Sequence, residues 1–408
     1  MKQKFINNGY EIVEFEHVAD IYVINTCTVT SMADRKSRQM LRRAKQINPN
    51  SLLVIVGCYV QVGKEELEKI EEVDLVLGNN EKNDIVKYVE KYQEKTSIVS
   101  DINKQQEYND FGNTTYTEKV RAFIKVQDGC NNFCSYCIIP YARGRVRSRK
   151  IENVVSEITD IAKSGIKEVV ITGIHIASYG KDFEEKISLI DLLEEINKIE
   201  GIERIRLGSL EPKLITEEFV ERLSKLEKIC DQFHMSLQSG CNETLERMNR
   251  KYTTKDFKIG VQTLRKAYPN SLLTADIIVG FPGETDEEFN ITYDFLKEIG
   301  FYKIHTFKYS KRKGTVAEKF SNQISPEIQE ERSKKVIELS SMMQKEYNNS
   351  YIGKEVKVLF EEKEGKYYKG HTPNYMIVQV KNDENLENQI KTVKIEEIEN
   401  DKLIGKIL

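Results

Sequence analysis

The chain begins with three apolar runs of strand length that alternate with amphipathic stretches of helix length. The runs are IYVINT (21–26), LLVIVG (52–57) and DLVLG (74–78), and the main helical patterns cover about 29–47 and 82–93. Uninterrupted apolar runs are typical of parallel strands that are covered on both faces. We therefore expect a flavodoxin-like α/β sheet here, with functional residues in the loops after its strands.

The same alternation continues from residue 119 to 310 with longer spacing. Six strand-like runs cover 122–127, 167–173, 204–209, 233–238, 273–280 and 303–309. The five helical stretches between them cover 151–164, 187–199, 214–226, 254–267 and 285–299. Six parallel strands with intervening helices predict a partial (β/α)6 barrel, whose functional residues lie at the carboxyl ends of the strands.

The remaining stretches have different patterns. Residues 95–118 are polar and aperiodic, which predicts a linker, and 326–349 read as a charged helix. From residue 352 onward, five short strands follow one another in about 57 residues, which predicts a small β-barrel at the C-terminal end. We expect domains at 1–94, 119–345 and 346–408.

Composition limits the class of protein. The 408 residues carry a net charge of −3, with 31% charged, so the chain is no polycation. No apolar run is long enough to span a bilayer, and the start lacks the pattern of a signal peptide. Seven cysteines without a disulfide-like arrangement favour a reducing cytoplasm and metal binding.

Basic residues gather in two runs, one within 35–45 and one within 143–150. Such runs can neutralise phosphates, and they can equally be solvated helix faces. For the first run both interpretations stay open. The second run follows the cysteine loop described next, which favours contact with a substrate.

Three cysteines, Cys130, Cys134 and Cys137, are spaced C-x3-C-x2-C. Three thiolates on one loop can hold three corners of a cubane iron–sulfur cluster and leave one iron open. A structural zinc site normally closes with four ligands, and the loop offers no fourth Cys or His. Three structural thiols are the alternative.

This spacing, with Tyr136 before the third cysteine, resembles the radical S-adenosylmethionine (SAM) signature. The resemblance implies a 4Fe-4S cluster whose open iron binds SAM, and reductive cleavage of SAM to a 5′-deoxyadenosyl radical. The three cysteines would be catalytic and would hold the metal, and Tyr136 would lie against the cofactor.

The segments INTCTVT and VGCYVQ resemble the amino-terminal domain of the methylthiotransferase family. In that family three cysteines hold a second iron–sulfur cluster, and Cys27 and Cys58 match two of them. The family's first cysteine has no counterpart here, so we expect an N-terminally truncated chain that supplies two of the three ligands. Two buried structural thiols are the alternative.

The resemblance to the radical SAM superfamily implies further SAM contacts at the strand ends. Thr172 and Gly173 would take the amino group through backbone carbonyls, and Ser209 with Glu211 would bind the ribose or the ammonium group. Polar residues after the fourth strand and one arginine would contact the ribose and carboxylate: these are Gln238, Ser239 and Arg250. Each has a structural alternative, as a loop residue or a helix-terminal acid. His175 and His305 are expected to be structural.

The C-terminal strands resemble the TRAM domain, an RNA-binding barrel. Five aromatic or basic residues suit base stacking and phosphate contact: Tyr367, Tyr368, Lys369, His371 and Tyr375. A stabilising or oligomer-forming barrel is the alternative.

The resemblance to the methylthiotransferase family covers nearly the whole chain, and it implies insertion of sulfur at an unactivated C–H bond, followed by methylation. The expected substrate is C2 of N6-threonylcarbamoyladenosine beside the anticodon of tRNA. Isopentenyladenosine in tRNA or a ribosomal protein are alternative substrates. The expected partners are the tRNA anticodon stem-loop, a reductant such as flavodoxin or ferredoxin, and a sulfur donor. An iron–sulfur RNA-binding protein without catalysis is the alternative from another class.

Overall fold

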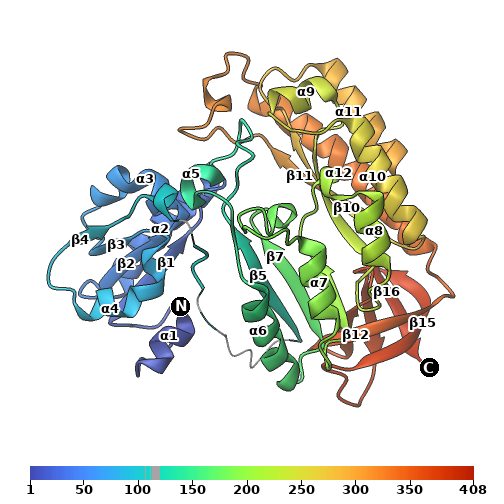
Figure 1. The fold of residues 1–408 in the computed structure, drawn as a ribbon, viewed down its shortest axis with the longest axis horizontal. Coiled ribbons are helices and arrows are strands. Elements are labelled where there is room, and N and C mark those ends of the chain that lie inside the picture. The colour runs from blue at the N-terminus through green and yellow to red at the C-terminus, as the bar shows by residue number, and fades with distance from the viewer. Residues whose placement is uncertain (106, 111, 113–119) are drawn as a thin grey trace. The chain divides into compact units, whose positions relative to one another are not determined.

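The computed structural model describes residues 1–105, 107–110, 112 and 120–408 (Figure 1). Contacts divide the chain into two units. The first unit comprises Met1–Thr115, Asp128–Ser148 and Ser310–Lys319, and the second unit comprises Tyr116–Gln127, Arg149–Tyr309 and Phe320–Leu408. The loop with three cysteines therefore belongs to the same unit as the amino-terminal sheet.

A four-stranded parallel sheet forms the centre of the first unit. Its strands β1 (Ile21–Thr26), β2 (Leu52–Gly57), β3 (Leu75–Leu77) and β4 (Thr96–Ile98) are neighbours in that order. The apolar runs predicted the first three strands. The fourth lies inside 95–118, the stretch interpreted as a linker.

Helices and short elements complete the first unit. They are α1 (Lys2–Asn7), α2 (Ser31–Ile47), α3 (Cys58–Glu68), α4 (Ile85–Glu90), α5 (Ile139–Arg143) and β6 (Arg147–Ser148). The helix predicted from about residue 29 begins two residues later because the Thr30 side chain accepts a hydrogen bond from the Ala33 backbone and caps it.

Alternate residues of β2 face opposite helical layers. Leu53 and Ile55 pack in a cluster with residues of α2 and α3, whereas Val54 and Val56 pack with residues of α1 and α4. All four side chains are fully buried. Because successive strand side chains point to opposite faces, a continuous apolar run is what a sheet between two helical layers requires.

Six parallel strands build the barrel part of the second unit. They are β5 (Arg121–Asp128), β7 (Glu168–Gly173), β8 (Arg204–Leu207), β9 (Gln232–Gln238), β10 (Leu272–Val279) and β11 (Lys303–Lys308). Strand β5 pairs with β7 and β7 with β8, while β10 lies between β9 and β11. Between β8 and β9 the hydrogen bonding is reduced to isolated bridges, such as Leu210 with Met235. The predicted partial barrel is confirmed.

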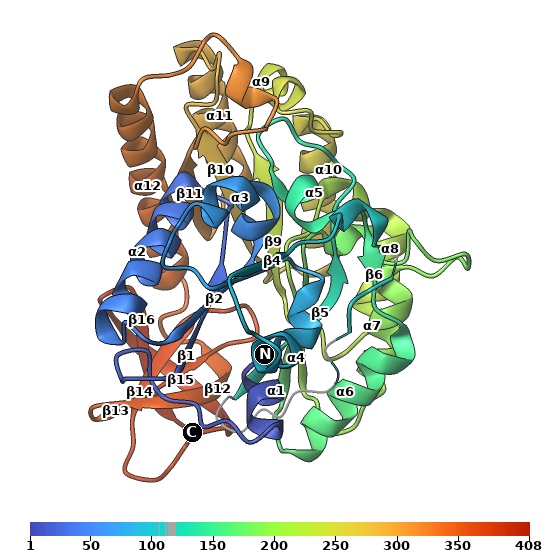
Figure 2. The same ribbon diagram turned by 90° about the vertical axis from the view of Figure 1, so that its left-hand side faces the viewer.

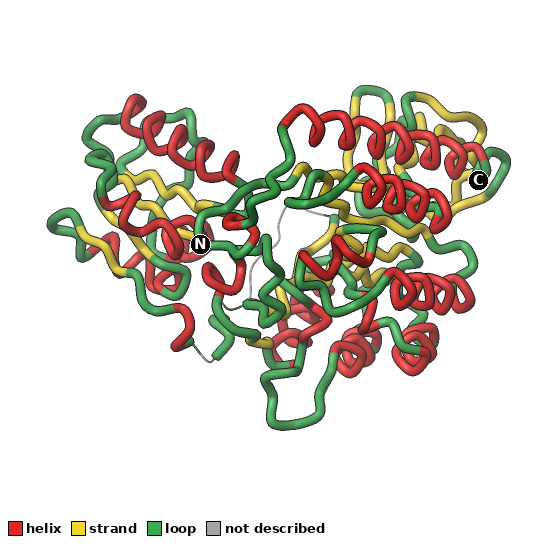
Figure 3. The backbone as a smooth tube through the Cα atoms, turned by 90° about the horizontal axis from the view of Figure 1, so that it is seen from above, coloured by secondary structure: helices red, strands yellow, loops and turns green. Residues whose placement is uncertain are grey.

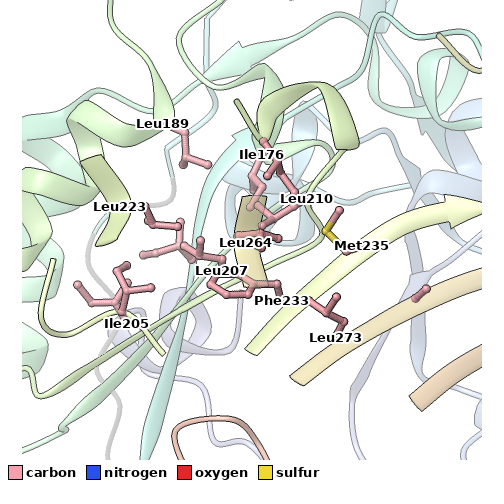
Figure 4. Close-up of a cluster of buried hydrophobic side chains, with 14 of the residues drawn as sticks. Ile176, Leu189, Ile205, Leu207, Leu210, Leu223, Phe233, Met235, Leu264 and Leu273 are labelled. Atoms are coloured by element: carbon pink, nitrogen blue, oxygen red, sulfur yellow. The ribbon is translucent and has the colours of Figure 1, made fainter. Parts of the chain in front are cut away.

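Helices alternate with these strands along the chain. Figure 3 shows the helices in red and the strands in yellow. The helices are α6 (Ile151–Lys163), α7 (Leu189–Asn197), α8 (Glu217–Ser224), α9 (Asn242–Arg247), α10 (Thr254–Ala267), α11 (Asp286–Ile299) and α12 (Pro326–Asn349). One continuous hydrophobic cluster fills the space between strands and helices. Figure 4 shows part of it, where Leu207, Phe233 and Leu264 meet from β8, β9 and α10.

The C-terminal strands form a closed barrel, also within the second unit (Figure 2). The strands are β12 (Glu355–Glu364), β13 (Tyr367–His371), β14 (Ile377–Lys381), β15 (Ile390–Glu399) and β16 (Lys402–Ile407). Their order is β12-β13-β14-β16-β15, and their inward side chains form a separate apolar cluster. Closure removes free strand edges, and it confirms the small barrel predicted from the short strands.

A buried ionic network joins the two barrels of the second unit. Glu168, which is fully buried in β7, lies 2.7 Å from Arg206 Nε, 3.5 Å from Arg121 Nε and 3.7 Å from Arg204 Nη1. Arg206 donates to the backbone carbonyl of Thr372, and Arg204 to that of His371, in the C-terminal barrel. One carboxylate therefore holds the arginines that anchor the smaller barrel.

No helix in the described part of the chain is both long enough and apolar enough to cross a membrane.

Candidate functional site

Backbone hydrogen bonds within the three-cysteine loop hold it in shape. The Cys130 N–H donates to the Gly144 carbonyl at 3.0 Å, and the Cys137 N–H donates to the Cys134 carbonyl at 2.9 Å. Gly129 has a φ of 71°, and a Cβ there would overlap the Arg145 carbonyl oxygen. Only glycine therefore lets the chain turn from strand β5 into the loop.

The thiols of this loop have the donor chemistry of an iron–sulfur site. Cys134 is buried, and Cys130 and Cys137 are half-buried. Three cysteine thiolates from one short loop are suitable ligands for three irons of a cubane cluster. Within the described ranges, no group of three or more His, Cys, Asp or Glu side chains is gathered closely enough to hold a metal ion. Tyr136, between the second and third cysteines, is partly exposed.

The two amino-terminal cysteines follow neighbouring strands. Cys27 comes directly after β1 and is exposed, whereas Cys58 is the first residue of α3 and is buried. Thr26 and Gly57, the residues before them, are partners in the parallel register. A Cβ on Gly57 would overlap the Thr26 backbone, so this glycine allows the close approach. The register places both cysteines at the same edge of the sheet, as predicted from their positions after strands.

A basic side chain from the cysteine loop reaches Cys58. The Arg143 Nε–H donates to the Cys58 sulfur at 3.0 Å, and Arg143 Nη1 lies 3.4 Å from Asp128 Oδ2. Burial acts to lower the pKa of Arg143, but Asp128, Cys58 and Cys27 together hold this pKa above its ordinary value. The guanidinium therefore stays charged beside the amino-terminal thiols.

In the second unit, Thr172 and Gly173 end strand β7, where the sequence placed them. Gly173 is the register partner of Gln127, and a Cβ on this glycine would lie 3.0 Å from the Gln127 carbonyl oxygen. The Gln127 side chain accepts a hydrogen bond from the His175 backbone N–H at 2.7 Å. This close packing fixes the backbone that follows the strand.

Glu211 is the centre of a polar cluster after β8. Its carboxylate lies 3.1 Å from His175 Nε2 and 3.4 Å from Arg250 Nη2. Burial acts to raise the pKa of Glu211, but the hydrogen bond from His175 and the charges of His175 and Arg250 outweigh it and lower this pKa. His175 was expected to be structural, yet it lies at the predicted site. The sequence feature that could have predicted His175 as a site residue is its position two residues after Gly173, at the end of a strand.

The remaining predicted SAM contacts differ in backbone conformation and in exposure. Gln238, the last residue of β9, has a φ of 68°, which is rare for a residue with a side chain and typical of functional sites. The Ser239 hydroxyl is fully buried against Thr292 of α11 at 3.1 Å, so it faces a helix. Ser209 is exposed after β8. The structure thus gathers Glu211 and Arg250, and it turns Ser239 away from solvent.

Comparison with known proteins adds to this geometry. Residues 124–296 match the radical SAM superfamily, and residues 1–78 match the uncharacterized protein family UPF0004. The chain is 42% identical over 402 residues to the threonylcarbamoyladenosine tRNA methylthiotransferase MtaB of Bacillus subtilis (strain 168), with 96% of this chain and 89% of that protein covered. The chain belongs to the radical SAM methylthiotransferase family. It is therefore a transferase, and its cofactors are a 4Fe-4S cluster and SAM.

Two further similarities are informative. The tRNA-2-methylthio-N(6)-dimethylallyladenosine synthase of Clostridium novyi (strain NT) is 38% identical over 360 residues, with 86% of this chain and 80% of that protein covered. The structure of the radical SAM methyltransferase TsrM from Kitasatospora setae matches with a TM-score of 0.56 at 16% identity, and the match covers 71% of this chain and 62% of that one. The second similarity supports the fold.

The two basic runs of this methylthiotransferase differ in how far their charges are matched inside the fold. Arg147 and Arg149, from the second run, are buried, and they pair with Asp128 and Glu157 respectively. The expectation that this run contacts substrate is wrong for these two residues, because their charges are already matched inside the fold. In the first run, Arg38 pairs with Glu66 at the surface, whereas Arg35, Lys36, Arg42 and Arg43 are exposed, so both interpretations stay open there.

The aromatic and basic set of the C-terminal barrel is only partly exposed. Tyr368 and His371 are buried, and Lys369 lies 2.9 Å from Glu362 Oε1. Tyr375 is 40% exposed, with its ring stacked on His371 at 4.6 Å between centroids. Tyr375 is the most exposed residue of the predicted set, but the guanidinium groups of Arg206 and Arg121 also lie over its ring, 4.7 and 5.3 Å from its centroid.

A cavity of about 460 Å³ lies away from the predicted SAM contacts in this methylthiotransferase. Its lining includes Arg121, Gln232 and Lys303, which begin strands β5, β9 and β11, and Tyr375 of the C-terminal barrel. In parallel barrels catalytic residues gather at the opposite, carboxyl ends of the strands. We therefore place the candidate site at those carboxyl ends.

Proposed function

We propose that the chain adds a methylthio group to C2 of N6-threonylcarbamoyladenosine in tRNA. Its 42% identity to the MtaB enzyme over 96% of the chain carries this proposal. The adenosine lies beside the anticodon, so the expected partner is the anticodon stem-loop. A reductant such as flavodoxin or ferredoxin and a sulfur donor complete the set of partners.

Each part of the chain receives a role in this proposal. Residues 1–94 together with strand β4 form the sulfur-handling domain, 119–345 the radical SAM domain and 346–408 the TRAM-like RNA-binding domain. Cys130, Cys134 and Cys137 hold the cluster that binds SAM. When bound, this cluster and SAM supply the radical chemistry that an unactivated aromatic C–H bond requires.

Residues of the chain itself position the cofactor. Thr172 and Gly173, at the carboxyl end of β7, are proposed to bind the SAM ammonium group through their backbone carbonyls. Glu211, kept ionised by His175 and Arg250, offers an acceptor to the SAM ribose or ammonium group. Gln238 and Ser209 are the further candidate polar contacts, and the inward-facing Ser239 contributes by packing the turn.

The amino-terminal cysteines Cys27 and Cys58 are proposed as ligands of a second cluster that handles the transferred sulfur. Their donor chemistry fits such a cluster, since thiolates are its usual ligands and Arg143 places an N–H at one of the sulfurs. The isopentenyladenosine branch is the second candidate function, which the 38% identity to the Clostridium novyi enzyme supports.

Nucleoside mass spectrometry of tRNA distinguishes the two substrates. A strain that lacks both methylthio nucleosides would receive this chain or an empty vector. We expect the methylthio form of N6-threonylcarbamoyladenosine to appear only with the chain. Appearance of the methylthio form of isopentenyladenosine alone would refute the preferred substrate.

A further inference from the structure

Arg143 connects the radical SAM loop to an amino-terminal thiol. It is the last residue of α5, which follows the three cysteines, and its Nε–H donates to the Cys58 sulfur at 3.0 Å. Asn79 approaches the same sulfur at 3.9 Å and donates to the Ala142 carbonyl at 2.7 Å. All of these residues belong to the first unit. The sulfur of Cys58 thus faces two N–H donors, both tied to α5.

The guanidinium of Arg143 is itself held in place. Asp128, directly before the cysteine loop, lies 3.4 Å from Arg143 Nη1 and accepts from the Gly129 N–H at 2.9 Å. Arg147 donates to the Arg143 carbonyl at 2.8 Å and lies 3.7 Å from the same carboxylate. Carboxylate and sulfur therefore occupy different N–H groups of one planar fork, which fixes their relative position.

A second arginine fixes the loop that carries Cys27. Arg312 donates to the Thr28 hydroxyl at 2.5 Å and pairs with Asp34 at 2.7 Å. From the same segment, the Ala317 N–H donates to the Ser135 carbonyl, inside the three-cysteine loop, at 2.8 Å. The Cys27 loop is thus tied to the segment that follows strand β11, and Cys58 is tied to the three-cysteine loop.

We propose that Arg143 is a positioning residue that holds the sulfur at Cys58 against the radical SAM loop. The proposal rests on the proposed function in taking Cys58 as part of the sulfur-handling site. A charged N–H donor stabilises negative charge on sulfur and fixes its place. Hydrogen bonds to cluster sulfurs also influence the reduction potential of a cluster. Arg143 would therefore both position the Cys58 sulfur and influence the reduction potential of the cluster that Cys58 binds.

The contact is tested first on the iron-free chain under reducing conditions. Thermal midpoints would be measured for Arg143→Gln, Cys58→Ala and the double variant. We expect the thermal midpoint of the double variant to fall by less than the sum of the two single decreases. Either single substitution already removes the hydrogen bond, so the second one cannot remove it again. Additive losses would overturn the proposal.

Arg38→Gln provides the matched control for this double-mutant cycle. Arg38 also packs against the start of α3, donating to the Tyr59 hydroxyl at 2.5 Å, and it pairs with Glu66. No hydrogen bond joins Arg38 to the Cys58 sulfur, so the decreases in thermal midpoint caused by Arg38→Gln and by Cys58→Ala should be additive. Coupling as large as that of Arg143 would show a general effect of α3 and would contradict a specific contact.

The second test reads the potential of the cluster at Cys58. Anaerobically reconstituted protein with Cys134→Ala would lack the radical SAM cluster, leaving the other for redox titration by electron paramagnetic resonance. We expect Arg143→Gln to shift the midpoint to a more negative potential, Arg143→Lys to restore part of it, and Arg38→Gln to leave it unchanged. An unchanged midpoint in Arg143→Gln would overturn the proposal.

The two tests separate this proposal from the proposed function. If no cluster depends on Cys58, the second-cluster part of the proposed function fails. The thermal cycle on the iron-free chain then decides the Arg143 contact alone. If the cluster forms and the cycle is additive, the proposed function stands and the role of Arg143 is refuted.

Discussion

Replacing Glu168 with glutamine is expected to destabilise the second unit strongly. This carboxylate is fully buried and hydrogen-bonds Arg206 through both oxygens, at 2.7 and 3.3 Å. Arg121 and Arg204 lie within 3.7 Å of it. Glutamine keeps the size of the side chain but removes the charge, so Arg204 and Arg206 would lose their carboxylate partner and Arg121 would keep only its ion pair with Glu361.

The size of the effect follows from burial. Removing one partner of a buried ion pair costs about 3–5 kcal/mol, because it leaves an uncompensated charge inside the protein. For a unit of this size, such a loss corresponds to a drop in melting temperature on the order of 10 °C. The backbone carbonyls of His371 and Thr372 would lose well-placed donors as well, which weakens the anchoring of the C-terminal barrel.

Scanning calorimetry of the purified chain tests this expectation, with Glu194→Gln as the matched control. Glu194 also pairs with an arginine, Arg222 at 2.8 Å, but about a third of each side chain is exposed. An exposed pair contributes roughly 0–1 kcal/mol. Equal melting temperatures for the two variants would refute the claim that Glu168 organises the junction.

Three further predictions concern the cofactor residues. Glu211→Gln removes the charge that His175 and Arg250 face, so the affinity for SAM should fall by on the order of tenfold in titration calorimetry, and an unchanged affinity would contradict the assignment. The pKa of Glu211 is lowered in the fold, so its contribution to stability is present at neutral pH and is lost as pH falls through that lowered pKa. The difference in melting temperature between wild type and this variant should therefore shrink as pH falls below the ordinary pKa of a glutamate. Gly129→Ala should abolish iron binding at the cysteine loop, whereas Gly365→Ala, where a Cβ meets open space at a similar φ, should bind iron normally; normal iron content in the first variant would refute the role of this turn.

Strand positions could be predicted because a strand that is buried on both faces has an uninterrupted run of apolar residues in the sequence. The run at 52–57 became β2, Leu52–Gly57, residue for residue, since both faces of that strand are covered and no polar position interrupts it. Strand β4, Thr96–Ile98, escaped prediction because it has three half-buried residues in a polar stretch. An edge strand of that kind carries no apolar signal.

The candidate site could be predicted less completely. Spacing located the cysteine loop, but the bond between Arg143 and Cys58 joins residues 85 positions apart, and no local pattern encodes it. Ser239 was expected to contact SAM from its place after β9. The left-handed backbone of Gln238 instead turns that hydroxyl toward Thr292, which the period of a regular strand cannot reveal.

The central claim is that Cys130, Cys134 and Cys137 hold the cluster that cleaves SAM. Anaerobically reconstituted wild type and Cys134→Ala would be compared for iron content and for 5′-deoxyadenosine formed from SAM with a chemical reductant. Cys230→Ala, a buried cysteine of the second unit, is the control. We predict that wild type and the control form 5′-deoxyadenosine and that Cys134→Ala forms none while losing about four irons. Retained 5′-deoxyadenosine formation in Cys134→Ala would contradict the account.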